Sequence, residues 1–216
     1  MAIQRGRFIT VEGGEGAGKS THLSTMVDYL RAEGIDVIST REPGGTGVAE
    51  AIRELLLARR DESLDPLTEL LLVFAARAQH VARVIRPALA VGRWVVCDRF
   101  TDASYAYQAA GRQMGPHPVT LLAGLVHPDL KPDLTLYLDV PTAQGLARAR
   151  SRGRPDRFEE ETDPFFDRVR QGYLDLAAAE PDRMKTVNAA GDLEYVRNKV
   201  LAALDVFLAQ YRQGRA

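Results

Sequence analysis

The 216-residue chain has one cysteine, almost no net charge and no long apolar run. The single thiol, Cys97, excludes an internal disulfide and is typical of a reducing compartment, so we expect a cytoplasmic protein. A run of roughly 18 apolar residues, which a membrane-spanning helix needs, is missing, so we expect no membrane partner. The net charge of −1 provides no overall basic field, so nucleic acid is not an expected partner either.

The most informative stretch is residues 7–21. Phe8, Ile9 and Val11 form a short apolar run that predicts a buried strand. Glycines follow immediately, and the stretch from Gly13 to Ser20 has the spacing G-x-x-x-x-G-K-[ST]. A chance glycine-rich turn is the alternative, but strand, loop, Lys-Ser pair and helix occur here in the required order.

Each part of this loop has a physical role in binding phosphates. Glycines allow the backbone N–H groups to approach an anion closely, and the following helix directs its positive end toward it. Lys19 supplies a charge for the terminal phosphates, and the Ser20 hydroxyl is a ligand for Mg²⁺. The sequence therefore predicts ATP with Mg²⁺, bound by Gly13, Gly14, Glu15, Gly16, Ala17, Gly18, Lys19, Ser20 and Thr21.

The rest of the chain alternates apolar strands with amphipathic segments. We predict further strands over 35–39, 93–97, 134–139 and 184–187, with helices over 21–33, 48–58, 66–90, 101–110, 118–127, 164–179 and 192–211 and after Pro141. Pro87 is expected to kink or end its helix. The order predicts an α/β fold, a five-stranded parallel sheet of the P-loop NTPase type with helices on both faces, in one domain over 1–216.

Charged residues cluster where the predicted strands end. Ligands of such sheets lie at the carboxyl ends of the strands, and the sequence places there Glu12, Glu15, Arg41, Glu42, Asp98, Arg99 and Asp139. For any one of them, a helix cap or a solvated surface charge is an alternative role. For Asp98 we favour a functional role, in which its carboxylate holds Mg²⁺ through water.

Seven segments together resemble the thymidylate kinases, which phosphorylate dTMP with ATP. They are EGGEGAGKS (12–20), TREPGGT (40–46), FAARAQH (74–80), CDRF (97–100), SYAYQ (104–108), PDLTLYLD (132–139) and RGRPDRFE (152–159). The phosphate loop alone occurs in many families, whereas the combination is specific. The resemblance implies direct in-line transfer of the ATP γ-phosphoryl group to dTMP, for dTTP synthesis.

The resemblance also implies an acceptor site. In this family the residue matching Glu15 hydrogen-bonds the deoxyribose 3′-hydroxyl, and Arg53 and Arg99 match residues that hold the dTMP phosphate. Arg77, Ser104 and Gln108 would meet the thymine edge, where only Ser or Gln can accept from the base N3–H because Arg has no acceptor. The ring of Tyr107 would exclude a ribose 2′-hydroxyl.

One position departs from the family pattern. Family members often stack an aromatic ring on thymine from four residues before the matching arginine, where this chain has Val73. Phe74 follows it, and one helical residue turns the side chain by about 100°. Phe74 is therefore a candidate either for stacking on thymine or for the core.

A basic segment over about 148–160 is expected to form a mobile lid over the triphosphate. A solvated basic helix end is the alternative. The phosphate loop contains no arginine, so the resemblance implies that the lid supplies the catalytic one, and Arg152 matches the family position. Arg148 would lie along the adenine. We therefore expect Lys19, Arg152, Asp98 and Glu15 to be catalytic.

Two alternatives remain open at this stage. A kinase for dCMP or for several nucleoside monophosphates would share the loop and the lid, and a nucleotide-dependent switch would share the loop. Family resemblance further suggests a homodimer through apolar helices such as 66–90, although such helices can equally be core.

Overall fold

The computed structural model describes residues 4–59, 61–151, 157, 158 and 160–213. Its centre is a five-stranded sheet in the order β2-β3-β1-β4-β5, in which all neighbours pair in parallel, as predicted. The strands are β1 (Phe8–Glu12), β2 (Val37–Arg41), β3 (Trp94–Asp98), β4 (Leu134–Asp139) and β5 (Met184–Asn188). In the centre, Ile9 lies opposite Val96 and Leu134. All five residues of β1 are buried, because helices cover both of its faces.

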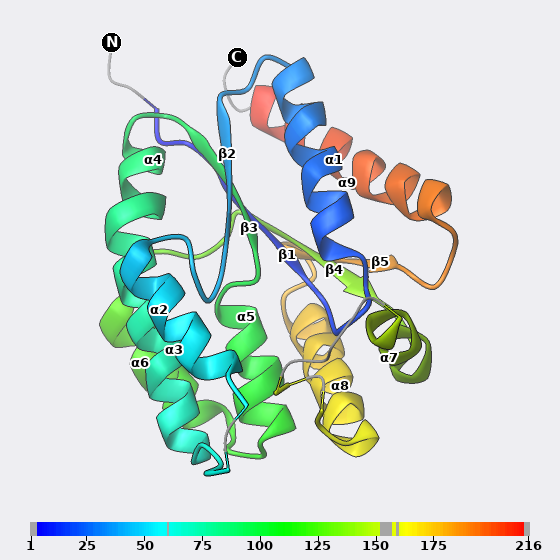
Figure 1. The fold of residues 1–216 in the computed structure, drawn as a ribbon. Helices are drawn as coiled ribbons and strands as arrows, with labels where there is room; N and C mark the ends of the chain where they lie inside the picture. The colour runs from blue at the N-terminus through cyan, green and yellow to red at the C-terminus, as the bar shows by residue number, and fades with distance from the viewer. Residues whose placement is uncertain (1–3, 60, 152–156, 159, 214–216) are drawn as a thin grey trace.

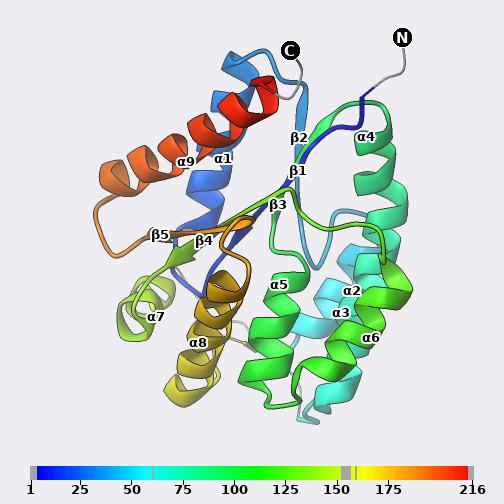
Figure 2. The same ribbon diagram turned by 180° about the vertical axis from the view of Figure 1, so that it is seen from behind.

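Helices lie on both sides of this sheet (Figure 1). They are α1 (Lys19–Ala32), α2 (Gly47–Leu57), α3 (Pro66–His80), α4 (Arg86–Ala90), α5 (Thr101–Ser104), α6 (Pro116–Val126), α7 (Thr142–Arg150), α8 (Asp163–Ala179) and α9 (Leu193–Gln213). Figure 2 shows α1 and α9 together on one face and α2, α3, α4 and α6 beyond the other. A core under α1 and α9 contains Met26, Leu30 and Leu204, and a second core under α4 contains Phe8, Val95 and Leu89.

Two segments are π-helical, which the sequence pattern does not predict: η1 (Val81–Ile85) and η2 (Tyr105–Gly111). The predicted helix 66–90 stays helical from Pro66 to Ala90 but includes η1, where the Arg86 N–H bonds the Val81 carbonyl five residues back. Pro87 has no N–H to donate, which interrupts the regular i to i−4 bonding, and η1 lies directly before this interruption. The helix therefore does not end at Pro87, and a π-helical turn precedes it.

The second strand begins later than predicted. The Ile35 N–H bonds the Leu30 carbonyl in the last turn of α1, so Ile35 takes part in ending that helix, and β2 starts at Val37. Gly34, with φ of +78°, makes the turn between the two elements. Among the residues that the structure describes, no helix is both long and apolar enough to cross a lipid bilayer.

Candidate active site

The parallel sheet brings the predicted charged residues to one edge. The phosphate loop leaves the end of β1, Glu42 follows β2, Arg99 follows β3, and Asp139 ends β4. Because these strands are neighbours, residues far apart in sequence become adjacent. The edge therefore carries both the loop and the groups that could surround a second ligand.

The loop is closed by backbone contacts that only glycine permits. Gly16 has φ of +70°, and a Cβ there would lie 1.9 Å from the Gly145 carbonyl oxygen of α7. Gly18, with φ of +86°, precedes α1 and supplies no side-chain cap, which leaves the first N–H groups of this helix available to an anion. The loop is thus fixed against α7, while the N–H groups at the start of α1 remain open to a ligand.

Lys19 is buried and lies back along the loop. Its Nζ donates to the carbonyl oxygens of Gly13 at 3.0 Å and Gly14 at 2.9 Å. Burial lowers the pKa of this amine, as does the nearby Arg99 charge, and Glu15 opposes both effects. This ammonium group therefore holds the loop closed, and its predicted contact with the terminal phosphates stays a prediction.

Asp98 has the features of a water-bridged metal carboxylate. Its Oδ1 is buried and lacks a hydrogen-bond partner among the described residues. A buried acceptor without a donor is costly unless water or a cation completes it. The described residues contain no group of three or more His, Cys, Asp or Glu that could hold a metal. The open Asp98 oxygen thus fits the predicted water-bridged contact with Mg²⁺, to which Ser20 would add a hydroxyl, and the ion itself stays a prediction.

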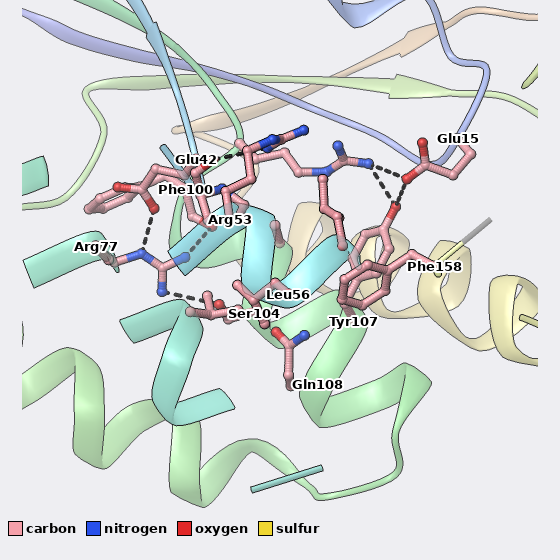
Figure 3. Close-up of a pocket in the computed structure, with 15 residues that line it drawn as sticks. Glu15, Glu42, Arg53, Leu56, Arg77, Phe100, Ser104, Tyr107, Gln108 and Phe158 are labelled. Carbon is pink, nitrogen blue, oxygen red and sulfur yellow. Dashed lines mark hydrogen bonds and ion pairs between the residues drawn. The ribbon is translucent and has the colours of Figure 1, made fainter. Parts of the chain in front are cut away.

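A cavity of about 250 Å³ opens beside the loop (Figure 3). Of the eight residues predicted to bind dTMP, the lining includes Glu15, Arg53, Arg77, Arg99, Ser104, Tyr107 and Gln108. They come from the loop, α2, α3, the turn after β3, α5 and η2. One wall is strongly basic and another carries hydroxyl and amide groups. Such a lining suits a nucleotide with its phosphate at one end and its base at the other.

Glu15, Arg99 and Tyr107 meet at the boundary between the loop and the cavity. The Glu15 Oε1 accepts from Arg99 Nη2 at 2.6 Å and from the Tyr107 hydroxyl at 2.8 Å. Burial would raise the pKa of Glu15, but the Arg99 and Lys19 charges dominate and lower it to about 2. Glu15 is therefore an anion at neutral pH, able to accept a hydrogen bond from a ligand hydroxyl. Arg99 reaches it from a left-handed backbone with φ of +66°.

Arg77 is buried, and three hydrogen bonds hold its guanidinium group in one orientation. Its Nε donates to Glu42 at 2.7 Å, Nη1 to Ser104 Oγ at 3.0 Å and Nη2 to the Phe100 carbonyl at 3.0 Å. The second Glu42 oxygen contacts His80 Nδ1 at 2.9 Å. Burial raises the pKa of Glu42, but the Arg77 and His80 contacts outweigh it and lower that pKa below its usual value. The pair is thus a rigid donor aimed at the cavity.

Phe74 lies behind Arg77 rather than in the cavity wall. Its ring is buried among Leu70, Ala109 and Val119, and the Arg77 guanidinium carbon lies 4.5 Å from the ring centroid. Val73, one residue earlier, is the position that lines the cavity. Of the two roles left open by the sequence, the geometry favours the core, where Phe74 supports the arginine by a cation–π contact.

Two important residues are absent from the sequence-based site. Phe158 lines the cavity. Glu69 is fully buried, and its carboxylate accepts hydrogen bonds from Gln108, Arg112 and Arg157. The signal for Glu69 was an acid on the apolar face of α3, four residues before Val73. Phe158 is one of the RGRPDRFE residues and carried no separate signal.

The predicted lid is described only in part. Arg152 lies outside the described residues, as does most of the segment around it. Arg157 stacks on Phe158, with its guanidinium carbon 4.3 Å from the ring centroid, and bonds the Leu56 carbonyl at 2.9 Å. Arg148 donates to the carbonyl oxygens of Ala189 at 2.9 Å and Ala190 at 3.2 Å, and so joins α7 to the loop after β5. The predicted adenine contact of Arg148 stays a prediction.

The fold and this site define a class: an α/β kinase with a phosphate-binding loop and an adjacent nucleotide-sized acceptor cavity. The family model "Thymidylate kinase" matches residues 11–200. The thymidylate kinase of Pseudomonas fluorescens (strain SBW25) is 56% identical over 207 residues, 96% of this chain and 99% of that one. That of Teredinibacter turnerae is 54% identical over 203 residues, 94% and 99%. The crystal structure of Ehrlichia chaffeensis thymidylate kinase superposes with a TM-score of 0.75 at 33% identity, covering 93% of this chain and 99% of that one.

The chain belongs to the thymidylate kinase family. It is a nucleotide-binding transferase that uses ATP and phosphorylates dTMP to dTDP.

Proposed function

We propose that dTMP occupies the cavity of Figure 3 with its base toward Arg77 and Gln108 and its phosphate toward the loop. The observation that carries this proposal is the convergence of seven predicted substrate residues on one cavity. Arg77 and Ser104 provide donors for the thymine carbonyls, and Gln108 accepts from N3–H. Tyr107 packs beside the sugar, and Glu15 accepts from its 3′-hydroxyl.

Arg53 and Arg99 hold the acceptor phosphate. Arg53 is tied to the Pro43 carbonyl through Nη1 at 2.9 Å, and Arg99 is tied to Glu15, so neither side chain has to be ordered on binding. Guanidinium groups fixed in this way neutralise the dianion and orient one of its oxygens for in-line attack. That oxygen is already anionic near neutral pH, so the reaction needs no general base.

ATP binds on the phosphate loop, with its terminal phosphates against Lys19 and the first turn of α1. Ser20 and Asp98 would hold Mg²⁺, the serine directly and the aspartate through water. When bound, this ion neutralises charge on the β- and γ-phosphates. Transfer then proceeds directly between the two nucleotides without a phosphoenzyme, and the product is a precursor for dTTP.

Arg152 is the catalytic arginine in this proposal, with residues of about 148–160 acting as the lid. The absence of arginine from residues 12–21 supports the assignment, because the transferring phosphoryl group needs a second cation. Phe158, which lines the cavity, supports it as well, and Arg157 bonds the carbonyl of the cavity residue Leu56, so the end of the segment lies next to the acceptor site.

Arg152→Ala tests the assignment. We expect turnover to fall at least about a hundredfold while dTMP affinity is kept, because the side chain acts on the transferring group. Turnover is measured as ADP released with dTMP, and affinity by calorimetric titration. Arg31→Ala, which removes an exposed arginine from the far end of α1, is the matched control. Unchanged turnover in Arg152→Ala, or an equal loss of dTMP binding, contradicts the lid assignment.

We further propose that the enzyme is a cytoplasmic homodimer whose 216 residues form one domain. Exposed leucines support the dimer: α3 carries Leu67 and Leu71, and the adjacent α6 carries Leu121 and Leu125. These side chains would be covered by a second copy. The buried, unpaired thiol of Cys97 is consistent with a reducing compartment.

A further inference from the structure

Gln108 presents one of its two amide ends to the cavity, and which end it presents decides what base it can read. A glutamine oxygen accepts from the N3–H of thymine, whereas its NH₂ group would donate to the bare N3 of a cytosine. The side chain alone prefers neither orientation. Selection between the two bases therefore needs a second residue that fixes the amide.

Glu69 is in contact with that amide. Gln108 Nε2 lies 2.9 Å from Glu69 Oε1, and Glu69 itself has no exposed surface. Burial raises the pKa of Glu69, but hydrogen bonds and charge from Arg112, with bonds from Gln108 and Arg157, outweigh it and lower that pKa below its usual value. An ionised carboxylate can only accept hydrogen bonds, so Gln108 must give it the NH₂ group. Its oxygen is left for the cavity, and none of the described residues donates to it.

The carboxylate itself is held by two arginines. Oε1 accepts from Arg112 Nε at 3.2 Å, and Oε2 accepts from Arg112 Nη2 at 3.0 Å and from Arg157 Nη2 at 2.7 Å. The Oε2 side therefore faces two charged donors and the Oε1 side faces one arginine N–H and the glutamine. If position 69 carried an amide instead of a carboxylate, this asymmetry would decide on which side its oxygen and its NH₂ group lie.

We propose that Glu69 is a specificity-determining positioning residue, which orients Gln108 so that the cavity accepts the N3–H of thymine and rejects bases with an N3 acceptor. This inference rests on the proposed placement of the base. Glu69 touches no substrate and acts only through Gln108. It also connects the base-reading residue to Arg157, which stacks on the cavity residue Phe158.

The variant E69Q reverses the orientation. The oxygen of the new amide takes the Oε2 side, because two arginine donors face it, and the NH₂ group of the new amide takes the Oε1 side. Gln108 then turns its oxygen toward position 69 and its NH₂ group toward the base. The N3–H of thymine then faces the NH₂ group of Gln108, a second donor, whereas the bare N3 of cytosine can accept a hydrogen bond from it.

The test compares dTMP with 5-methyl-dCMP, which has the same shape and carries an amino group and a bare N3. We expect the ratio of kcat/KM for dTMP to that for 5-methyl-dCMP to fall about five- to fiftyfold in E69Q, the size of one mispaired buried hydrogen bond. E161Q is the matched control, since Glu161 pairs with Arg112 Nη1 at 2.5 Å from outside the cavity. Its ratio should stay that of the unchanged enzyme, and Q108A should lower the ratio.

The outcomes separate the inference from the base placement. A folded E69Q with an unchanged ratio, together with a lowered ratio in Q108A, overturns the role of Glu69 alone. An unchanged ratio in Q108A overturns the placement of the base, and the inference with it.

A second measurement needs no Glu69 variant. In the unchanged enzyme without nucleotide, the side-chain NH₂ resonances of Gln108, assigned by their loss in Q108A, should be protected from solvent exchange by the bond to Glu69. Rapid exchange of these protons overturns the inference.

Discussion

Glu12 has an unusual environment for a carboxyl group. It ends β1 with no exposed surface, and its oxygens accept from the Phe100 N–H at 2.7 Å and the Tyr173 hydroxyl at 2.8 Å. Burial raises its pKa to about 8, with the Asp102 charge adding to the effect. Glu12 thereby anchors the turn that presents Arg99, but as a largely protonated acid at neutral pH.

The protonation of Glu12 makes stability depend on pH. Between about pH 4.5 and 8 the folded chain keeps a proton that the unfolded chain has lost, so the free energy of unfolding falls as pH rises. The slope from this one group reaches about 1.4 kcal/mol per pH unit. In Glu12→Gln the amide oxygen accepts from the Phe100 N–H and the NH₂ group donates to the Tyr173 oxygen, so both contacts are kept without the titration. We expect its unfolding free energy, relative to the unchanged enzyme, to increase by at least about 2 kcal/mol from pH 5 to pH 8.

Urea unfolding at several pH values measures this difference. Glu62→Gln, a change at an exposed glutamate, serves as the control and should give a curve parallel to that of the unchanged enzyme. A parallel curve for Glu12→Gln as well would show that Glu12 does not keep its proton.

Single residues of the cavity are predictable where the family resemblance implies their role. Arg53, Arg77 and Gln108 were all assigned to the acceptor site from sequence, and all line the cavity. Glu69 was not, because its importance comes from contacts with residues that lie 39 to 88 positions away in the chain. The position of Phe74 in the core likewise depends on how α3 is rotated about its axis. Val73 faces the cavity, and Phe74, one residue later, faces the core.

At the scale of elements, the packing of the phosphate loop against α7 gives a direct test. Gly16 combines a left-handed φ with a Cβ position 1.9 Å from a backbone oxygen, whereas a Cβ on Gly14 would meet nothing within 4 Å. We expect Gly16→Ala to lower the free energy of unfolding by about 2 kcal/mol or more, and Gly14→Ala to change it by less than about 0.5 kcal/mol.

Thermal unfolding without nucleotide compares the two variants, because it isolates the fold from the loss of phosphate binding. Equal melting temperatures for the two alanine variants would mean that α7 moves aside at little cost.

The elements themselves were predictable from periodicity and from the placement of glycine and proline. All five strands and the principal helices occur where apolar patterns predicted them. The departures are local and arise from hydrogen bonding: Ile35 is retained by the end of α1, and η1 forms ahead of Pro87. A pattern of side chains reports which face is buried, but it does not report which carbonyl an N–H selects.

For the whole molecule, the proposed dimer can be tested at Leu71. This side chain is 49% exposed on α3, and Val206 is 58% exposed on α9, on the opposite side of the sheet. A glutamate in a buried dimer interface is strongly unfavourable, so Leu71→Glu should be monomeric, while Val206→Glu keeps the mass of the unchanged enzyme.

Light scattering after gel filtration gives the masses. The unchanged enzyme should have twice the mass of the 23.8 kDa chain. A single-chain mass for the unchanged enzyme, or a dimeric Leu71→Glu, contradicts an interface through α3.

The contact between Gly16 and Gly145 also couples the position of α7 to that of the phosphate loop. Main chain touches main chain there, with no side chain between them to absorb a displacement by changing rotamer. A tilt of α7 would therefore displace the phosphate loop directly. We therefore expect α7, which leads into the arginine-rich segment, and the phosphate loop to shift together.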